Sequence, residues 1–195
     1  MYVRCGLAWE RAEEAALRRF LRALGARREG RLARLVRLEL PLAPLYGRGH
    51  WSVSGRGVPG VRAALASNYL PGRNLLLGSL AAVHCARARI PVFALALLGD
   101  NPFPDATPGF LRTFGRCASQ ALGMPITVRT PFRRLGKEAV IRLGRDLPLG
   151  LTLSCARPRG VRHCGRCTKC AERRAAFARA GVADPTTYAG GRRGA

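Results

Sequence analysis

The residues best suited to hold a metal ion are four cysteines near the C-terminal end of the sequence. Cys164, Cys167 and Cys170 form a Cys-x-x-Cys-x-x-Cys motif, and an eight-residue loop containing Gly and Pro separates them from Cys155. Turns at this spacing can aim three sulfurs at one point, and the loop can bring the fourth sulfur back. Four thiolates make a closed tetrahedral zinc site. Because such a site leaves no position for substrate, we expect a structural zinc ion and not a catalytic one.

The same four cysteines allow other interpretations. An iron–sulfur cluster also takes four thiolates, His163 could compete as a ligand, and the cysteines could be free thiols or a redox pair. Four cysteines at this density in a reducing compartment favour a metal. The neighbouring arginines would lower the pKa values of the thiols, and thiolates are the species that bind metal.

A second group of chemically useful residues is "YLPGRN", residues 69–74, which precedes a long apolar stretch. Pro71 suits the first turn of a helix, because its missing N–H has no partner there. A helix N-terminus attracts phosphate, and the Arg73 guanidinium is a forked donor for phosphate or carboxylate. A plain helix start with a solvated arginine explains the motif equally well.

A third group is "GDNPFPDATPGF", which directly follows the apolar run "PVFALALL". The run predicts a strand buried on both faces, so the loop lies at the carboxyl end of that strand. Ligands bind at that edge of open α/β sheets. Asp100, Asn101 and Asp105 are the polar side chains of the loop; a rigid surface turn is the alternative.

Lys137 is one of only two lysines among 34 basic residues, which hints at a site that needs a compact charge, although a surface lysine is the simpler explanation.

Composition and charge limit the classes of protein to consider. The 195 residues are enough for one domain with a core, and 48% of them are hydrophobic. We find no apolar run of about 18 residues and no signal peptide, so we expect a cytoplasmic protein without a membrane span. The net charge of +23 suggests a phosphate-rich partner or a coding bias towards arginine. Because the charge is spread along the chain without aromatic residues between, nucleic acid is not expected as the primary partner.

Hydrophobic periodicity predicts alternating helices and strands, and hence an α/β domain with a mostly parallel sheet. The stretch at 74–88 is apolar on nearly every face, which indicates a buried helix. We expect residues 1–150 to form a nucleotide-binding domain, 151–188 a zinc-binding segment packed on it, and 189–195 a disordered tail. The expected helices cover 10–24, 74–88, 107–122, 135–145 and 169–180, and the expected strands cover 32–40, 91–98 and 126–129.

Taken in order, these motifs resemble the 7-cyano-7-deazaguanine synthase family, within the pyrophosphate-loop ATPase superfamily. The resemblance rests on "YLPGRN", "GDNPFPDATPGF", "TPFRRLGKEAVIRLG", "LTLSCARP", "HCGRCTKCAERRAAFARAG" and "DPTTY", and it reaches to about Tyr188. The cysteines followed by "AERRAAF" are its most specific part. The resemblance implies a Rossmann-like fold of the adenine nucleotide hydrolase type, with a parallel sheet, helices on both faces and a C-terminal zinc-binding segment.

The resemblance also implies a reaction and its participants. ATP would activate 7-carboxy-7-deazaguanine as an acyl adenylate, ammonia would give the amide, and a second activation would give the nitrile. Magnesium is expected with ATP, zinc would be structural, and the assembly could be a homodimer. Carried over to this sequence, the family's catalytic residues would be Arg73, Asp105 and Lys137. Zinc would be held by Cys155, Cys164, Cys167 and Cys170; the nucleotide and substrate would be contacted by Tyr69, Arg73, Asn74, Asn101, Pro104, Asp105 and Lys137.

Two features depart from the family pattern. The superfamily opens with a strand and a Ser-Gly-Gly-x-Asp-Ser loop for pyrophosphate, and these 195 residues contain no such segment. We therefore expect the first, central strand to be absent from this sequence and Met1 to lie inside a longer reading frame; a two-part enzyme or an inactive remnant is the fallback. "RCGLAWE" and "HWSVSG" indicate a paralogous branch, which leaves the exact substrate open.

Two further functions stay open at this point. Another pyrophosphate-loop ligase or thiolase could act on a different substrate such as tRNA, but "NPFPDATPGF" resembles the deazaguanine branch and not the sulfur-transfer branch. A zinc-braced basic protein that binds nucleic acid without catalysis is the alternative from a different class.

Overall fold

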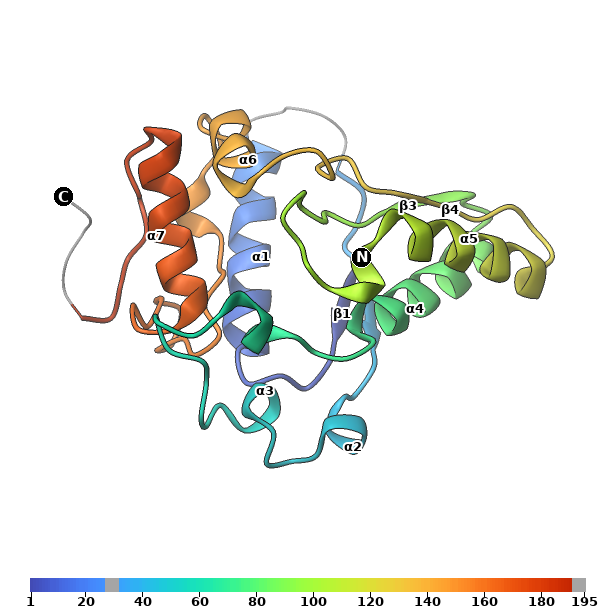
Figure 1. Ribbon diagram of the computed structural model, residues 1–195. Helices are drawn as coiled ribbons and strands as arrows, with labels where there is room; N and C mark the ends of the chain where they lie inside the picture. Colours follow the sequence, from blue (N-terminus) through green and yellow to red (C-terminus); the bar gives the residue numbers. More distant parts are fainter. Residues whose placement is uncertain (27–31, 191–195) are drawn as a thin grey trace. The chain divides into compact units, whose positions relative to one another are not determined.

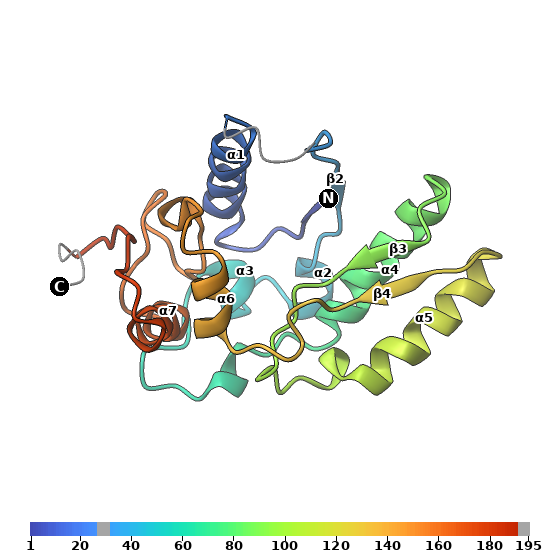
Figure 2. The same cartoon turned by 90° about the horizontal axis from the view of Figure 1, so that it is seen from above.

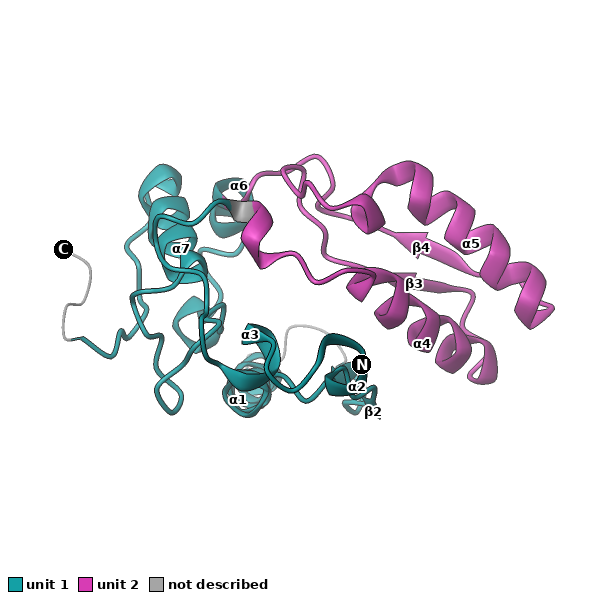
Figure 3. Ribbon diagram, turned by 60° about the horizontal axis from the view of Figure 1, so that its bottom comes forward, with its two compact units in different colours: residues 1–64, 138–195 teal, residues 65–137 magenta. Residues whose placement is uncertain are grey.

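The computed structural model describes residues 1–26 and 32–190, which form α/β structure with parallel strands (Figure 1). The chain divides into two compact units (Figure 3). The first unit comprises residues 1–64 and 138–195, and the second comprises residues 65–137. The expected division at residue 150 stays a prediction, and residues 191–195 of the expected tail lie outside the described residues.

The first unit contains one pair of parallel strands, and its register places Val3 opposite Leu38. Residues 32–40 were expected to form a strand, and the strand that forms there is shorter. The core of the first unit includes Ile141, Ala176 and Phe177, which pack with partly buried apolar side chains around them. The elements of this unit are β1 (Tyr2–Arg4), α1 (Glu10–Ala26), β2 (Arg37–Glu39), α2 (Ala43–Tyr46), α3 (Trp51–Ser54), α6 (Lys137–Leu143, from Glu138 onward), η3 (Leu149–Leu151) and α7 (Thr168–Ala180).

Helix α1 begins where a buried carboxylate accepts backbone hydrogen bonds. The Glu10 side chain accepts from the N–H groups of Cys5 and Gly6, so it fixes the turn between β1 and α1. Ala12 and Ala16 are buried on one side of the helix, which forms where the sequence predicted a helix over 10–24. An acidic residue in the first turn also suits the positive end of the helix dipole.

The second unit is built around a second pair of parallel strands. Phe93 of one strand lies opposite Val128 of the other, and α5 makes the crossover between them. Figure 2 shows the two strands side by side with α5 beside them. Thr107 caps α5 by accepting a 3.2 Å hydrogen bond from the Phe110 N–H. The elements are η1 (Leu65–Asn68), α4 (Arg73–Arg87), β3 (Val92–Ala94), η2 (Pro104–Ala106), α5 (Pro108–Leu122) and β4 (Thr127–Arg129).

The expectation that β3 is buried on both faces was wrong. Helices α4 and α5 contact one another, and each contacts one of the two strands, so they cover a single face. Phe93 points into the core on that face, whereas Val92 is 42% exposed on the other. Helix α4 is likewise buried on one side only, since Leu75 and Val83 are exposed. The expected α/β class with parallel strands is confirmed; the described residues form two two-stranded parallel sheets, and the larger sheet covered on both faces stays a prediction of the resemblance.

Among the described residues, no helix is both long enough and apolar enough to cross a membrane.

Candidate functional site

The four predicted metal ligands lie together in the first unit, and we call them the cysteine cluster. All four Sγ atoms lie within 4.8 Å of one another. The Sγ atoms are 3.9 Å apart for Cys155 and Cys167, 3.9 Å for Cys164 and Cys170, and 3.5 Å for Cys167 and Cys170. These separations are far longer than a disulfide bond of about 2.05 Å, and none of the seven cysteines is in a disulfide.

The backbone around the cysteine cluster is fixed by α7 and by a neighbouring loop. Cys167 precedes the first residue of α7, and Cys170 lies in its first turn. Cys167 forms an antiparallel bridge with Gly60, and the Thr168 hydroxyl donates to the Gly60 carbonyl over 2.8 Å. Gly165 has a φ of +74°, which side chains rarely adopt, so it permits the tight turn between Cys164 and Cys167.

The environment of the sulfurs favours a thiolate at Cys167. The Cys155 Sγ accepts the N–H groups of Arg157 and Cys164 at 3.3 and 3.2 Å, and the Cys164 Sγ accepts the N–H of Arg166 at 3.4 Å. Hydrogen bonds with the Cys155 and Cys170 sulfurs hold the pKa of Cys167 well below its ordinary value, whereas the hydrogen bonds within the cluster and burial raise the pKa values of Cys155 and Cys170. One thiolate therefore forms readily, which is the state that a metal requires.

The donor set fits a tetrahedral zinc ion. Zinc–sulfur bonds of about 2.3 Å place tetrahedral sulfurs about 3.8 Å apart. The three sulfur–sulfur distances of 3.5–3.9 Å are close to that value. Cys155, Cys167 and Cys170 are buried, and Cys164 is partly buried, so an ion among them would be shielded from water on most sides.

His163, which could have competed for the metal, has a different role in the structure. Its ring is buried, its Nε2 accepts the Ser154 N–H at 3.2 Å, and its edge packs on Tyr188. Burial lowers the pKa of His163 to about 4, so the ring is neutral at pH 7. Within the described part of the chain, the grouped ligand atoms are those of the four cysteines.

Arg173 is a structural residue of this region that sequence reasoning missed. It lies in α7 and is buried; its guanidinium donates to Thr186 Oγ1 at 2.6 Å and Thr152 Oγ1 at 3.0 Å. Asp184 lies 4.0 Å from it. The contact joins "AERRAAF" to "DPTTY", two of the motifs that carry the family resemblance. Arg173 lies between the charged residues Glu172 and Arg174, so its sequence neighbourhood indicates a solvated face and gives no signal of burial.

The predicted substrate-contacting residues belong to the second unit. Asp105 of η2 is buried, and its two carboxylate oxygens accept the N–H of Asn74 at 2.8 Å and the Asn74 side-chain amide at 3.1 Å. We call this pair the Asn74–Asp105 junction. It places an acidic side chain on the N-terminus of α4, where the helix dipole favours negative charge. This N–H, which could have bound a phosphate, is therefore already occupied by a carboxylate.

The same region brings Tyr69 close to the loop after β3. The Tyr69 ring packs on Phe103 with ring centroids 5.0 Å apart. Phe103 precedes Pro104, the first residue of η2, and the Asn101 side chain accepts the Phe103 N–H at 3.1 Å. The loop is thus held rigidly from within and by an aromatic contact.

Arg73 and Lys137 complete the set of predicted residues. Arg73 is the first residue of α4, and its Nε is buried without a hydrogen-bond acceptor among the described residues. Lys137 begins α6 and is the last residue of the second unit; it takes no part in the Asn74–Asp105 or Tyr69–Phe103 contacts. Arg133, which sequence reasoning missed, donates to the carbonyls of Leu98 and Gly99 and so fixes the start of the loop that follows β3.

Comparison with known proteins places the chain in a family. A family model described as "Queuosine biosynthesis protein QueC" matches residues 55–181. The chain is 36% identical over 194 residues to a 7-cyano-7-deazaguanine synthase of Anaeromyxobacter dehalogenans, with 92% of this chain and 80% of the relative covered. A synthase of the same name from Anaeromyxobacter sp. strain Fw109-5 is 35% identical, covering 91% and 80%. One from Ruegeria pomeroyi is 40% identical over 126 residues, covering 62% and 54%.

Proposed function

We propose that this chain, which belongs to the QueC family of queuosine biosynthesis proteins, is an ATP-dependent ligase that converts 7-carboxy-7-deazaguanine and ammonia into 7-cyano-7-deazaguanine. The observation that carries the proposal is the 36% identity to a 7-cyano-7-deazaguanine synthase over 92% of this chain. The Asn74–Asp105 junction supports it, because it orders the two motifs that the resemblance assigns to the substrate site.

The proposed reaction has two activations. The substrate carboxylate attacks the α-phosphorus of ATP, which releases pyrophosphate and leaves an acyl adenylate. Ammonia attacks the acyl carbon, AMP leaves, and the amide forms with loss of a proton. The amide oxygen is then adenylated by a second ATP with release of pyrophosphate, and loss of AMP and a proton gives the nitrile. Each activation moves negative charge onto pyrophosphate, so fixed cations lower its barrier.

Residues of the second unit would serve these steps. The Arg73 guanidinium, with its buried Nε lacking an acceptor among the described residues, would bind a phosphate or the substrate carboxylate. Lys137 would add a second cation. Tyr69 and Phe103 present aromatic surface of the kind that flat heterocycles stack on. Magnesium, when bound with ATP, would neutralise phosphate charge.

Asp105 would act as a positioning residue in this proposal. Both of its oxygens are engaged by Asn74, so its carboxylate holds the loop with Asn101 and Pro104 against the start of α4. A direct catalytic role for Asp105 stays a prediction. The cysteine cluster would brace the C-terminal part of the first unit, since zinc held by four sulfurs has no open coordination position.

The proposal is tested on the full chain with Mg-ATP, 7-carboxy-7-deazaguanine and ammonium, following pyrophosphate release and the product by mass spectrometry. We expect pyrophosphate to be released only when 7-carboxy-7-deazaguanine is present, and the nitrile to form. Arg73→Ala should lower kcat/KM by about 100-fold. Arg87→Ala, a change at the exposed end of the same helix, should leave it unaltered. Pyrophosphate release that does not depend on the acid would contradict the proposal.

A further inference from the structure

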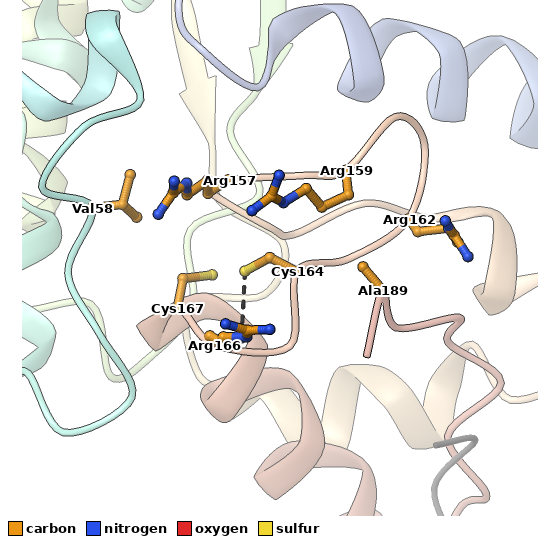
Figure 4. Close-up of a pocket in the computed structure, with 8 residues that line it drawn as sticks. All are labelled: Val58, Arg157, Arg159, Arg162, Cys164, Arg166, Cys167 and Ala189. Atoms are coloured by element: carbon orange, nitrogen blue, oxygen red, sulfur yellow. Dashed lines mark hydrogen bonds between the residues drawn. The ribbon is translucent and has the colours of Figure 1, made fainter. Parts of the chain in front are cut away.

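A basic cavity lies beside the cysteine cluster in the first unit, and the proposed ligase reaction makes no use of it (Figure 4). Its volume is about 380 Å³. Cys164 and Cys167 form part of its wall, and Val58 and Ala189 supply its apolar surface. We call it the arginine pocket because four guanidinium-bearing side chains line it: Arg157, Arg159, Arg162 and Arg166.

The four arginines have uncompensated charge. All four side chains are exposed. Among the described residues, none of them forms an ion pair with a carboxylate, and no acidic residue lines the cavity. This differs from Arg4, Arg18 and Arg37, which are all paired with Glu14. The pocket is therefore a concentration of positive charge that the chain leaves open to a ligand.

The backbone that carries these arginines is held in place. Arg159 and Arg162 face each other across a tight turn, with N–H to carbonyl hydrogen bonds of 2.9 and 3.1 Å in both directions. The backbone N–H groups of Arg157 and Arg166 donate to sulfurs of the cysteine cluster. Rigid attachment points with free guanidinium ends favour contacts to an anion, because less backbone entropy is lost on binding.

The negative charge of a zinc-loaded cysteine cluster is too small to neutralise the positive charge of the four arginines. Zinc with four thiolates carries a net charge of about −2. Four guanidinium groups bring about +4, which leaves an excess of about +2 beside the loaded site. Within the described part of the chain, the hydrogen bonds that reach the sulfurs from these arginines come from backbone N–H groups. The guanidinium groups thus remain available.

We propose that the arginine pocket binds the phosphodiester backbone of a nucleic acid. Guanidinium forks match phosphate oxygens, and backbone phosphates spaced along a strand would meet several arginines at once. A site for a small molecule is mostly apolar with a few placed polar groups, whereas this cavity has only Val58 and Ala189 as apolar contacts beyond the cysteines. The net charge of +23 would steer any polyanion towards the chain.

The experiment measures binding of a labelled single-stranded RNA of mixed sequence to the full, zinc-loaded chain by fluorescence anisotropy over a series of salt concentrations. The pocket variant replaces all four arginines by glutamine. The control variant removes the same charge from exposed arginines outside the pocket that form no ion pair among the described residues, through R11Q, R48Q, R87Q and R129Q. Zinc content and thermal unfolding verify that both variants remain folded.

Each phosphate contact contributes about −0.7 to the slope of log K against log salt for single strands. We expect the pocket variant to reduce the magnitude of this slope by about 2–3 and the control variant to change it by less than about 1. Equal losses in the two variants would mean that binding follows overall charge, and they would overturn the proposal.

A competition arm separates nucleic acid from a small phosphate ligand. We expect inorganic tripolyphosphate to displace the RNA only at high concentration. That concentration should be far above the concentration of RNA phosphate at which binding saturates. Tight tripolyphosphate binding in the absence of RNA binding would overturn the proposal. None of these measurements uses ligase activity, so they remain decisive if the proposed function fails. We also expect the pocket variant to form nitrile from the free acid at the rate of the unaltered chain.

Discussion

The cysteine cluster and the Asn74–Asp105 junction both rest on hydrogen bonds to backbone N–H groups, but they are assembled from very different distances along the chain. The cluster is formed within one segment, residues 155–170, by a loop and the first turn of α7. The junction joins residues 31 positions apart, one at the start of α4 and one in η2. A local site can be predicted from the spacing of its residues in the sequence. A site built from distant segments can be identified only from the folded structure.

The largest effect is expected from breaking the cluster. Cys167→Ser should lower the free energy of unfolding by about 4 kcal/mol or more, because loss of a metal site belongs to the most destabilising class of change. Urea unfolding and zinc analysis provide the measurement. Cys117→Ser, at an exposed cysteine outside the cluster, is the control and should change stability little. A zinc-free Cys167→Ser protein as stable as the original would show that the cluster is no brace.

The junction should show the next largest effect. Asp105→Ala leaves the Asn74 N–H and side-chain amide without their acceptor, at a cost of about 1–3 kcal/mol in a buried site. Asp105→Asn keeps one acceptor and should cost less. Chemical denaturation ranks the three proteins. If Asp105→Ala lost ligase activity while stability was unaffected, Asp105 would have a catalytic role and not a positioning one.

A smaller effect is expected from the turn inside the cluster. Gly165→Ala forces a side chain into a φ of +74° and brings its Cβ to 3.1 Å from Arg174 Nη2, so we expect a loss of about 1–2 kcal/mol. Gly109→Ala, in the first turn of α5 with open space around it, should be neutral or slightly stabilising. Thermal unfolding of both variants distinguishes them, and equal melting temperatures would mean that the turn tolerates a side chain.

The smallest effect is expected at Glu14, away from both regions. The hydrogen bond from Arg18, with the charges of Arg18, Arg37 and Arg4, lowers the pKa of Glu14 below its ordinary value. A lowered carboxyl pKa adds stability above the ordinary value of 4.5 and loses it as pH falls through the lowered pKa. Glu14→Gln should therefore cost no more than about 1 kcal/mol at pH 7, because the arginines are solvent-screened. Unfolding at acidic pH should show no difference, and a difference that persists there would point to lost packing.

Local patterns predicted much of the secondary structure and the cluster. The helices expected over 10–24 and 107–122 and the gathering of the four cysteines are confirmed. Each depends on residues within a few turns of one another, where spacing decides the geometry.

Long-range relations were harder to predict. The burial of β3 on both faces was wrong because an apolar run gives no information on how many layers cover it, and Val92 lies on the open face. Asp105 and Asn74 stood out in their own motifs, but the spacing within each motif does not reveal that they bond to one another, nor that Arg173 bonds to Thr186. The arginine pocket was likewise hidden, because exposed basic residues are common throughout a chain with a net charge of +23.

The central claim is that the cysteines brace a ligase whose chemistry is carried by other residues. The most direct test follows the full chain with 7-carboxy-7-deazaguanine, Mg-ATP and isotopically labelled ammonia by mass spectrometry. We predict labelled nitrile, with AMP and pyrophosphate as the other products. Conversion of the acid to neither amide nor nitrile by the zinc-loaded, folded chain would contradict the account.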